Sequence, residues 1–121
     1  MADAKGIELV QRLEDFAIAV IELTRGFPST PEYWEIRRQM IRSSASIGAN
    51  YVEARNARTR LEFFSCARIS LREAAETAWW LHITRRISRE PLGLRIDALL
   101  REVSEIVSIF GAITRKGRYR S

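Results

Sequence analysis

Four glutamates are the first candidates for chemistry, because carboxylates that face one another inside a helical bundle can hold a pair of metal ions. Such sites combine glutamates with a Glu-x-x-His motif on each of two helices. The sequence has one histidine, His82, and the motif does not occur. We therefore expect no metal site. The four glutamates are Glu53, Glu73, Glu76 and Glu102.

No other pattern of reactive residues indicates an enzyme. A nucleophile elbow, a phosphate-binding loop and a dinucleotide fingerprint are all missing. His82 has no neighbouring serine or cysteine motif to activate, and we interpret it as a surface or interface residue. The single cysteine, Cys66, excludes an intramolecular disulfide and is expected to pack as a small apolar side chain. The sequence predicts no catalytic residue and no cofactor.

The glutamates have a structural interpretation instead. They can pair with Arg42, Arg72 and Asn50, and so fix the register of the helices through a buried or half-buried polar network. We expect this network to consist of Arg42, Asn50, Glu53, Glu73 and Glu76.

Four helices must position these residues. Apolar side chains recur at intervals of three and four, the period of an amphipathic helix. The predicted helices span about 7–26, 32–55, 60–89 and 92–115, and a basic tail without periodicity follows at 116–121. The third helix is expected to face inward through Leu61, Phe64, Ala67, Leu71, Ala74, Ala78 and Leu81.

The helix boundaries carry their own signals. Pro28 and Pro31 separate the first two helices, and Pro91 separates the last two. Thr59 and Glu62 form a capping box at the start of the third. Small residues fill the middle of the second helix, which favours close helix packing over a gap for a ligand. Short loops between long helices predict a single all-α domain, an up-down-up-down four-helix bundle spanning 1–121.

The apolar surface is wider than one core requires. Trp79 and Trp80 are adjacent, so they point about 100° apart and cannot both enter the same core. One is expected in the interior and the other on a second apolar surface, which we interpret as a subunit interface. That surface also includes Phe63, Ile83 and Ile87, and the first helix adds Ile18 and Ile21.

Positive charge gathers at one end of the predicted bundle. The start of the first helix, the hinge between the second and third, and the C-terminus share that end. It carries eight basic and four acidic residues, and eight minus four leaves +4 of the chain's net charge of +5. At the opposite end the charges cancel. The basic residues are Lys5, Arg55, Arg58, Arg60, Arg115, Lys116, Arg118 and Arg120, and the acidic ones are Asp3, Glu8, Glu53 and Glu62.

The positive end has two interpretations. Clustered arginines attract nucleic-acid phosphates, and Tyr119 could stack on a base. The same charges also suit a solvated surface, since cations at helix C-termini complement the helix dipole. Binding would be directed at the backbone with little sequence specificity, because no base-reading motif is present.

Short motifs spread along the chain together indicate a family. They are Phe27-Pro28, Gln39, Arg42, Ser46-Ile47, Asn50, Glu53-Ala54, Glu62-Phe63, Ser70-Leu71, Glu73-Ala74, Glu76-Thr77, Trp80-Leu81 and Ile113 to Lys116. In these motifs the chain resembles the four-helix-bundle proteins encoded in intervening sequences of bacterial large-subunit ribosomal RNA genes, whose fold also occurs in accessory variability proteins of diversity-generating retroelements. The resemblance spans roughly Leu9 to Lys116. The chain departs from many members at Ala54, where they have glycine, and at Tyr51-Val52, where they have Ile-Ala.

The resemblance implies a ring-shaped homo-oligomer, usually a pentamer, without known enzymatic activity. The retroelement relatives bind nucleic acid and a reverse transcriptase. We therefore expect a non-enzymatic accessory protein that binds RNA or DNA through the rim of a ring. The alternative is a protein-interaction scaffold without nucleic-acid contact. Contacts with nucleic acid are assigned to Arg55, Arg58, Arg60, Arg115, Lys116, Arg118 and Arg120.

The expected location is the cytoplasm. No apolar run approaches the roughly 20 residues that cross a bilayer, so no membrane contact is predicted. The N-terminus lacks the hydrophobic segment of a secretory signal.

Overall fold

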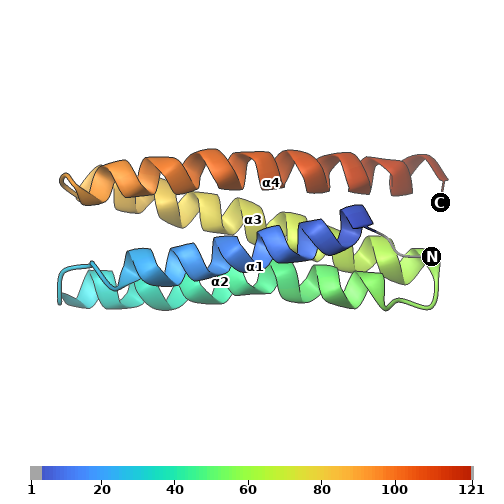
Figure 1. Cartoon of the computed structure of the whole chain (residues 1–121), viewed down its shortest axis with the longest axis horizontal. Helices are drawn as coiled ribbons and strands as arrows, with labels where there is room; N and C mark the ends of the chain where they lie inside the picture. Colours follow the sequence, from blue (N-terminus) through green and yellow to red (C-terminus); the bar gives the residue numbers. More distant parts are fainter. Residues whose placement is uncertain (1–3, 121) are drawn as a thin grey trace.

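The chain is helical through most of its length. The computed structural model describes residues 4–120, and their side chains as far as residue 117. Within this range lie no strand and four α-helices, namely α1 (Ala4–Thr24), α2 (Pro31–Arg55), α3 (Arg60–Ile87) and α4 (Leu92–Arg120). The all-α class with four helices is therefore confirmed. Figure 1 shows successive helices running in opposite directions along one long axis.

The end of α4 differs from the sequence prediction. A basic tail without periodicity was expected from residue 116, but α4 continues to Arg120. Gly117 is buried there, and a Cβ at this position would lie 2.7 Å from the ring of Phe64. Because only glycine allows so close an approach, the backbone of α4 packs directly on α3. The segment has no proline, so nothing in it interrupts the helix.

The core lies along the predicted apolar faces of all four helices. Along α2 the residues at helical spacing are all buried, namely Tyr33, Ile36, Met40, Ser44, Ile47, Tyr51 and Ala54. Trp80 packs against the core, whereas Trp79 is 61% exposed. Trp80 is therefore the interior ring and Trp79 the surface ring of the adjacent pair. The largest fully buried side chains include Phe110, Leu13, Leu23, Met40, Ile47, Leu81, Ile96 and Ile106.

Leu61 is the exception among the predicted core positions, since it is 70% exposed. A step of three residues along a helix falls about 60° short of a full turn. Two such steps in succession lead from Ala67 to Phe64 and from Phe64 to Leu61. They rotate Leu61 about 120° away from Ala67, so its side chain points to solvent.

A capping box begins α3, as predicted. The backbone amide of Glu62 donates to Thr59 Oγ1 at 3.1 Å. In return the Glu62 carboxylate accepts from the backbone amide of Arg58 at 3.0 Å, one residue before the cap. The box therefore fixes the hinge between α2 and α3 as well as the first turn of α3.

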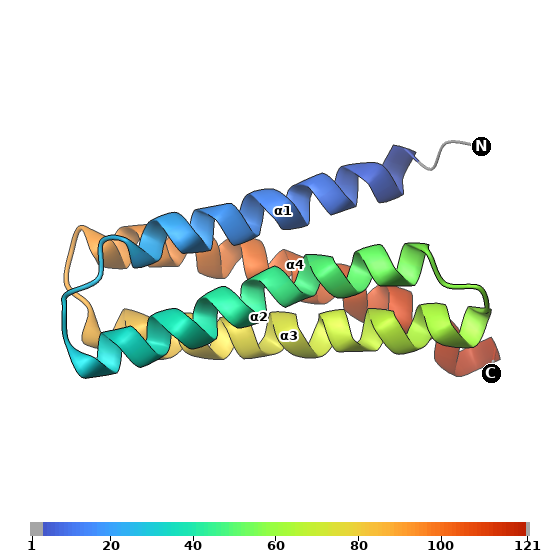
Figure 2. The ribbon, with the colours of Figure 1, turned by 90° about the horizontal axis from the view of Figure 1, so that it is seen from below.

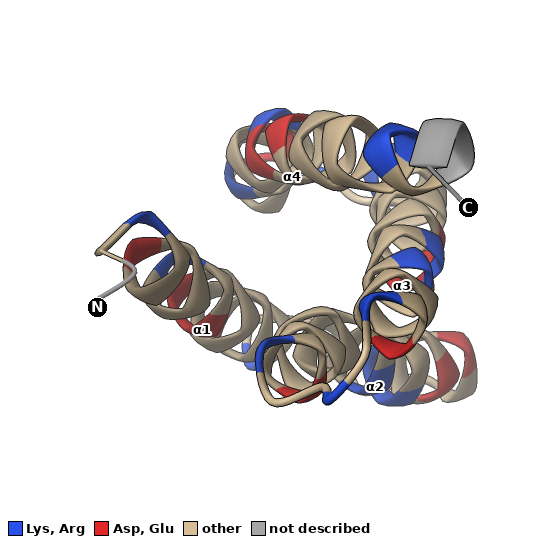
Figure 3. Ribbon diagram, turned by 90° about the vertical axis from the view of Figure 1, so that its right-hand side faces the viewer, with Lys and Arg blue, Asp and Glu red and all other residues tan. Residues whose placement is uncertain are grey.

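The four helices form an open arc. Seen along the bundle, they follow one another in the order α1, α2, α3, α4, and at the end that carries both termini α1 and α4 lie apart (Figure 3). Figure 2 shows the same divergence from another side, with α1 tilting away toward its N-terminus. Contacts between α2 and α3 are the most extensive, and those between α1 and α4 are the sparsest.

Candidate nucleic-acid interface

The positive end predicted from the sequence corresponds to one end of the structure. The start of α1, the hinge between α2 and α3, and the end of α4 all lie at the right of Figure 1. Basic segments mark each of these three places in Figure 3. We call this end the basic rim. Its basic residues with described side chains are Lys5, Arg55, Arg58, Arg60, Arg115 and Lys116, and all six are exposed.

Phe64 joins the two halves of the rim. The guanidinium carbon of Arg60 lies 5.0 Å from the centre of the Phe64 ring, a cation–π distance. Phe63 meets the same ring edge-on at 5.2 Å. The backbone of Gly117 packs against it from α4. One aromatic ring thus holds Arg60 on α3 next to the last turns of α4, where Arg115 and Lys116 lie.

Acidic side chains offset this charge only in part. Glu62 is occupied by the capping box, where it accepts the Arg58 amide. Among the described residues, Arg58, Arg60, Arg115 and Lys116 form no ion pair with an acid. The predicted contacts Arg118 and Arg120 belong to the final turn of α4, and their side chains lie outside the described part of the chain.

The structure brings three of the five predicted network residues together. Arg42 on α2 pairs with Glu73 on α3 at 3.2 Å and also with Glu76. The Glu76 carboxylate accepts a further hydrogen bond from Trp80 Nε1 at 3.2 Å. The hydrogen bond with Glu76 raises the pKa of Arg42. The cluster is half-buried and joins α2 to α3.

The other predicted members lie elsewhere. Asn50 bonds within its own helix, donating to the carbonyl oxygen of Ser46 at 2.9 Å. Glu53 is exposed and makes no ion pair among the described residues. Asn50 is rotated about 80° around α2 from Arg42, whereas Glu53 lies on nearly the same side but about three turns further along the helix. The predicted five-residue network is therefore a three-residue one.

Glu102 was expected to pair with this network but pairs with α1 instead. Arg12 donates to both Glu102 oxygens, at 2.7 and 2.8 Å, and to Glu105 at 3.1 Å. The hydrogen bond with Glu102 is the main cause that raises the pKa of Arg12. Arg72, the other expected partner, has no acidic partner among the described residues. The fork of Arg12 is the polar bridge between α1 and α4.

Sequence reasoning missed a row of buried hydroxyls between α2 and α3. Thr77 donates to or accepts from Ser43 at 2.8 Å, and both side chains are fully buried. Ser70 donates to the carbonyl oxygen of Ile47 at 2.8 Å. From the sequence, the small residues in the middle of α2 are interpreted only as permitting close packing. The available signal was a hydroxyl residue on the predicted buried face of each helix, which indicates a polar contact across the interface.

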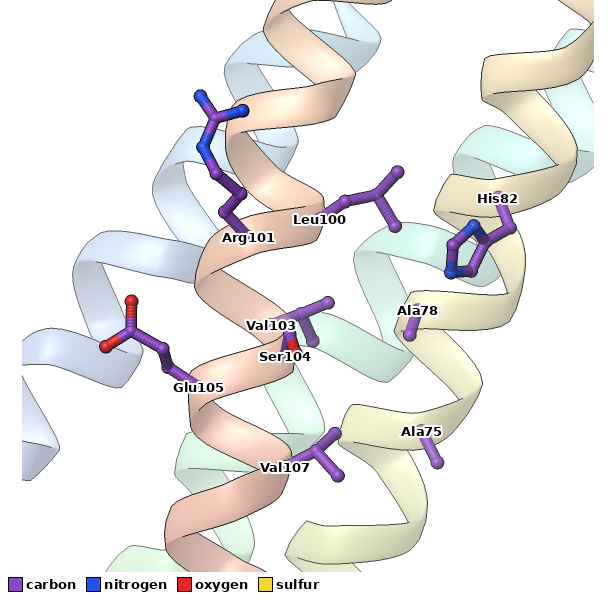
Figure 4. A pocket seen from close by; sticks show the side chains of 9 residues that line it. All are labelled: Ala75, Ala78, His82, Leu100, Arg101, Val103, Ser104, Glu105 and Val107. Carbon is purple, nitrogen blue, oxygen red and sulfur yellow. The ribbon is translucent and has the colours of Figure 1, made fainter.

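Grooves lie on the sides of the bundle. One of about 760 Å³ runs between α3 and α4. Figure 4 shows Leu100 and Val107 of α4 and Ala78 of α3 facing the same hollow, with His82 beside it. Another groove, of about 490 Å³, separates α1 from α4 near the basic rim. It is lined by Lys5, Gly6, Glu8, Leu9, Arg12, Tyr51, Ile109, Ile113 and Lys116.

The described residues offer no group of candidate metal ligands. No three of their His, Cys, Asp or Glu side chains come close enough together to bind a metal ion. None of their helices has the length and apolarity needed to span a membrane. Fold and site thus define a helical-bundle protein with a charged end and apolar grooves.

The comparisons with known proteins place the chain in a family. The family described as 23S rRNA-intervening sequence protein matches residues 5–109, and the chain belongs to it. A solved structure is also similar, with a TM-score of 0.75 and 29% sequence identity over 87% of this chain and 96% of the other. It is a protein of unknown function from the S23 ribosomal protein family of Bacteroides thetaiotaomicron. No curated protein matches.

Proposed function

We propose that this protein is a non-enzymatic accessory protein that binds RNA or DNA through its basic rim. The observation that carries the proposal is the group of exposed cations at this end, four of which form no ion pair with a described acid. Unpaired guanidinium groups are free to bind phosphates, and they release counterions from the nucleic acid when they do so. The contacts would be Arg55, Arg58, Arg60, Arg115, Lys116, Arg118 and Arg120.

We propose further that the protein acts as a homo-oligomeric ring, most simply a pentamer. Large apolar side chains exposed on single copies support this assembly, among them Ile18 and Val52, which are 47% and 42% exposed. Near both lies a shallow groove of about 230 Å³ between α1 and α2, lined in part by Ala45, Gly48 and Ala49. In a ring, several basic rims would share one face and multiply the attraction for phosphates. Native mass spectrometry tests the subunit number directly.

The same apolar surface favours a second candidate function, a scaffold for another protein. In that case the partner would cover Ile18 and Val52, and its binding would depend little on salt. Nucleic-acid binding depends steeply on salt, so the two functions separate in one titration.

The test is the affinity for labelled RNA and duplex DNA across a salt series, measured by fluorescence anisotropy. A variant with Arg55, Arg58 and Arg60 changed to Gln removes three rim charges. Its matched control changes Arg25, Arg89 and Arg95 to Gln, which removes three exposed charges at the opposite end.

We expect the wild-type affinity to fall steeply with salt. In the rim variant the slope of log affinity against log salt should become shallower by roughly 0.7 to 0.9 for each phosphate that the protein no longer neutralises. The control should keep the wild-type slope. Equal reductions in both variants would remove the rim from the proposal, and absence of binding at low salt would leave the scaffold as the better function.

A further inference from the structure

The outward face of α3 carries an aromatic ring set between arginines. Trp79, in the C-terminal half of this helix, is 61% exposed. Arg72 lies seven residues before it and Arg86 seven residues after it, and Arg68 lies one turn before Arg72. Spacings of four and seven residues keep side chains on one side of a helix. These four residues therefore form a single stripe, which we call the Trp79 stripe.

The stripe is positive because its arginines are not neutralised. Arg68, Arg72 and Arg86 form no ion pair among the described residues. The nearby acids of α3, Glu73 and Glu76, are turned toward α2, where Arg42 holds both. On α3 these two acids therefore lie at the contact with α2, and the unpaired arginines lie on the outer face.

A groove runs alongside the stripe. Ala75 and His82, four residues before and three residues after Trp79, line the hollow of about 760 Å³ between α3 and α4. Its walls are mostly apolar, with Leu100 and Val107 contributed by α4 (Figure 4). A flat apolar group lying on Trp79 would have this hollow directly beside it.

We propose that the Trp79 stripe binds single-stranded nucleic acid. One base stacks on the Trp79 ring, Arg72 and Arg86 bind phosphates on either side, and a neighbouring base enters the groove beside Ala75. This inference rests on the proposed function and extends it. The rim attracts nucleic acid of either form, whereas the stripe selects single strands, because only an unpaired base exposes its face for stacking.

The dimensions of the stripe suit an extended strand. Seven helical residues rise about 10 Å, so Arg72 and Arg86 lie about 20 Å apart along the axis with Trp79 midway. Both arginines are long enough to reach phosphates over part of that span. The occupant is inferred to be a polyanion from charge complementarity, since a protein segment of mixed charge would leave these cations unpaired.

The experiment compares Trp79→Ala with Trp34→Ala, a matched control because Trp34 is 59% exposed. Affinities for a labelled single-stranded RNA and for its duplex are measured at low salt. We expect Trp79→Ala to weaken single-strand binding about tenfold, in keeping with the contribution of one stacked base. Its duplex binding should stay within about twofold of wild type, and Trp34→Ala should leave both affinities unchanged.

Further variants make the outcomes separable. Trp79→Phe keeps an aromatic ring and should retain most of the single-strand affinity, while Arg72→Gln with Arg86→Gln should lower the salt dependence. If wild type binds RNA but Trp79→Ala binds single strands equally well, the stripe is not the site and the proposed function still stands. If wild type binds neither form, both proposals fail. A smaller oligomer in Trp79→Ala with unchanged affinity per chain would show that a second copy covers this face, and would also overturn the inference.

Discussion

The interface between α2 and α3 and the interface between α1 and α4, which we call the α2–α3 seam and the α1–α4 seam, are held together by different interactions. The first is lined with small residues and buried hydroxyls, with Ser43 bonded to Thr77 at its centre. The second depends on one polar bridge, Arg12 to Glu102 and Glu105, and opens into a groove of about 490 Å³ toward the rim. The closely packed α2–α3 seam has no room for a larger side chain, whereas the groove at the α1–α4 seam can accommodate one.

The largest expected effect comes from overfilling the closed seam. Ser43→Leu inserts a bulky side chain where the hydroxyl is fully buried, and we expect it to lower the free energy of unfolding by about 3 kcal/mol. Ile109→Phe makes a comparable addition beside the α1–α4 groove and should cost under about 1 kcal/mol. Urea denaturation of both variants measures the contrast. Equal costs would mean that the two seams are packed equally tightly.

Removing the polar bridges should reverse the order of the two seams. Arg12→Gln breaks a two-pronged bond to a carboxylate, and we expect it to lower the free energy of unfolding by about 1 to 2 kcal/mol. Arg42→Gln should cost less than about 1 kcal/mol, because packing and hydroxyl bonds still hold α2 against α3. Hydrogen exchange gives a local readout. It should become faster along α1 in the Arg12 variant and stay unchanged along α2 in the Arg42 variant; faster exchange in both would contradict the comparison.

Two glycines of α4 test why the α1–α4 seam opens. At Gly117 a Cβ would lie 2.7 Å from the Phe64 ring, so Gly117→Ala should push the end of α4 off α3 and cost about 1 kcal/mol net. At Gly111 a Cβ would lie 3.6 Å from Arg115, an ordinary contact. Gly111→Ala should therefore stabilise the helix by up to about 1 kcal/mol. Thermal melting of the pair is the measurement, and a stabilised Gly117→Ala would show that α4 is not drawn toward α3 there.

The smallest expected effect lies outside both seams. Glu35 on α2 accepts hydrogen bonds from Gln39 and Arg38, and these lower the pKa of its carboxyl, Gln39 being the larger cause. A depressed pKa in the folded state adds stability above the unfolded value, and this contribution disappears as the pH falls through the folded pKa. Glu35→Gln should therefore flatten the acid side of a plot of melting temperature against pH. If the melting temperature of the variant fell with decreasing pH as steeply as that of wild type, the hydrogen bonds to Glu35 would not persist in solution.

How far the sequence predicts each seam depends on how local its signals are. The apolar periodicity identified the buried faces of all four helices, and the capping box placed the start of α3. Leu61 was misplaced because two successive steps of three residues turn its side chain about 120° away from that of Ala67. The pairing of Arg12 with Glu102 could not be predicted, since it joins residues 90 positions apart whose register depends on the whole bundle.

The candidate site was predicted in composition more than in geometry. The excess of basic residues located the rim, because antiparallel helices bring known segments to a shared end. The role of Phe64 remained hidden, since its contact with Gly117 requires a backbone approach that no periodic pattern encodes. The Trp79 stripe is visible in the spacing of its residues. That its arginines are unpaired depends on the turn of Glu73 and Glu76 toward Arg42, which is a property of the folded state.

The Arg12 bridge also has a consequence for the order of folding. It joins residues 90 and 93 positions apart, and closing a long loop costs more entropy than closing a short one. The α2–α3 hairpin needs only a four-residue turn and has the most extensive contacts to offset that cost. Contacts near in sequence form first when they suffice to build a stable nucleus. We expect α2 and α3 to pair early and α1 to dock last, so that substitutions at Arg12 accelerate unfolding and leave the folding rate almost unchanged.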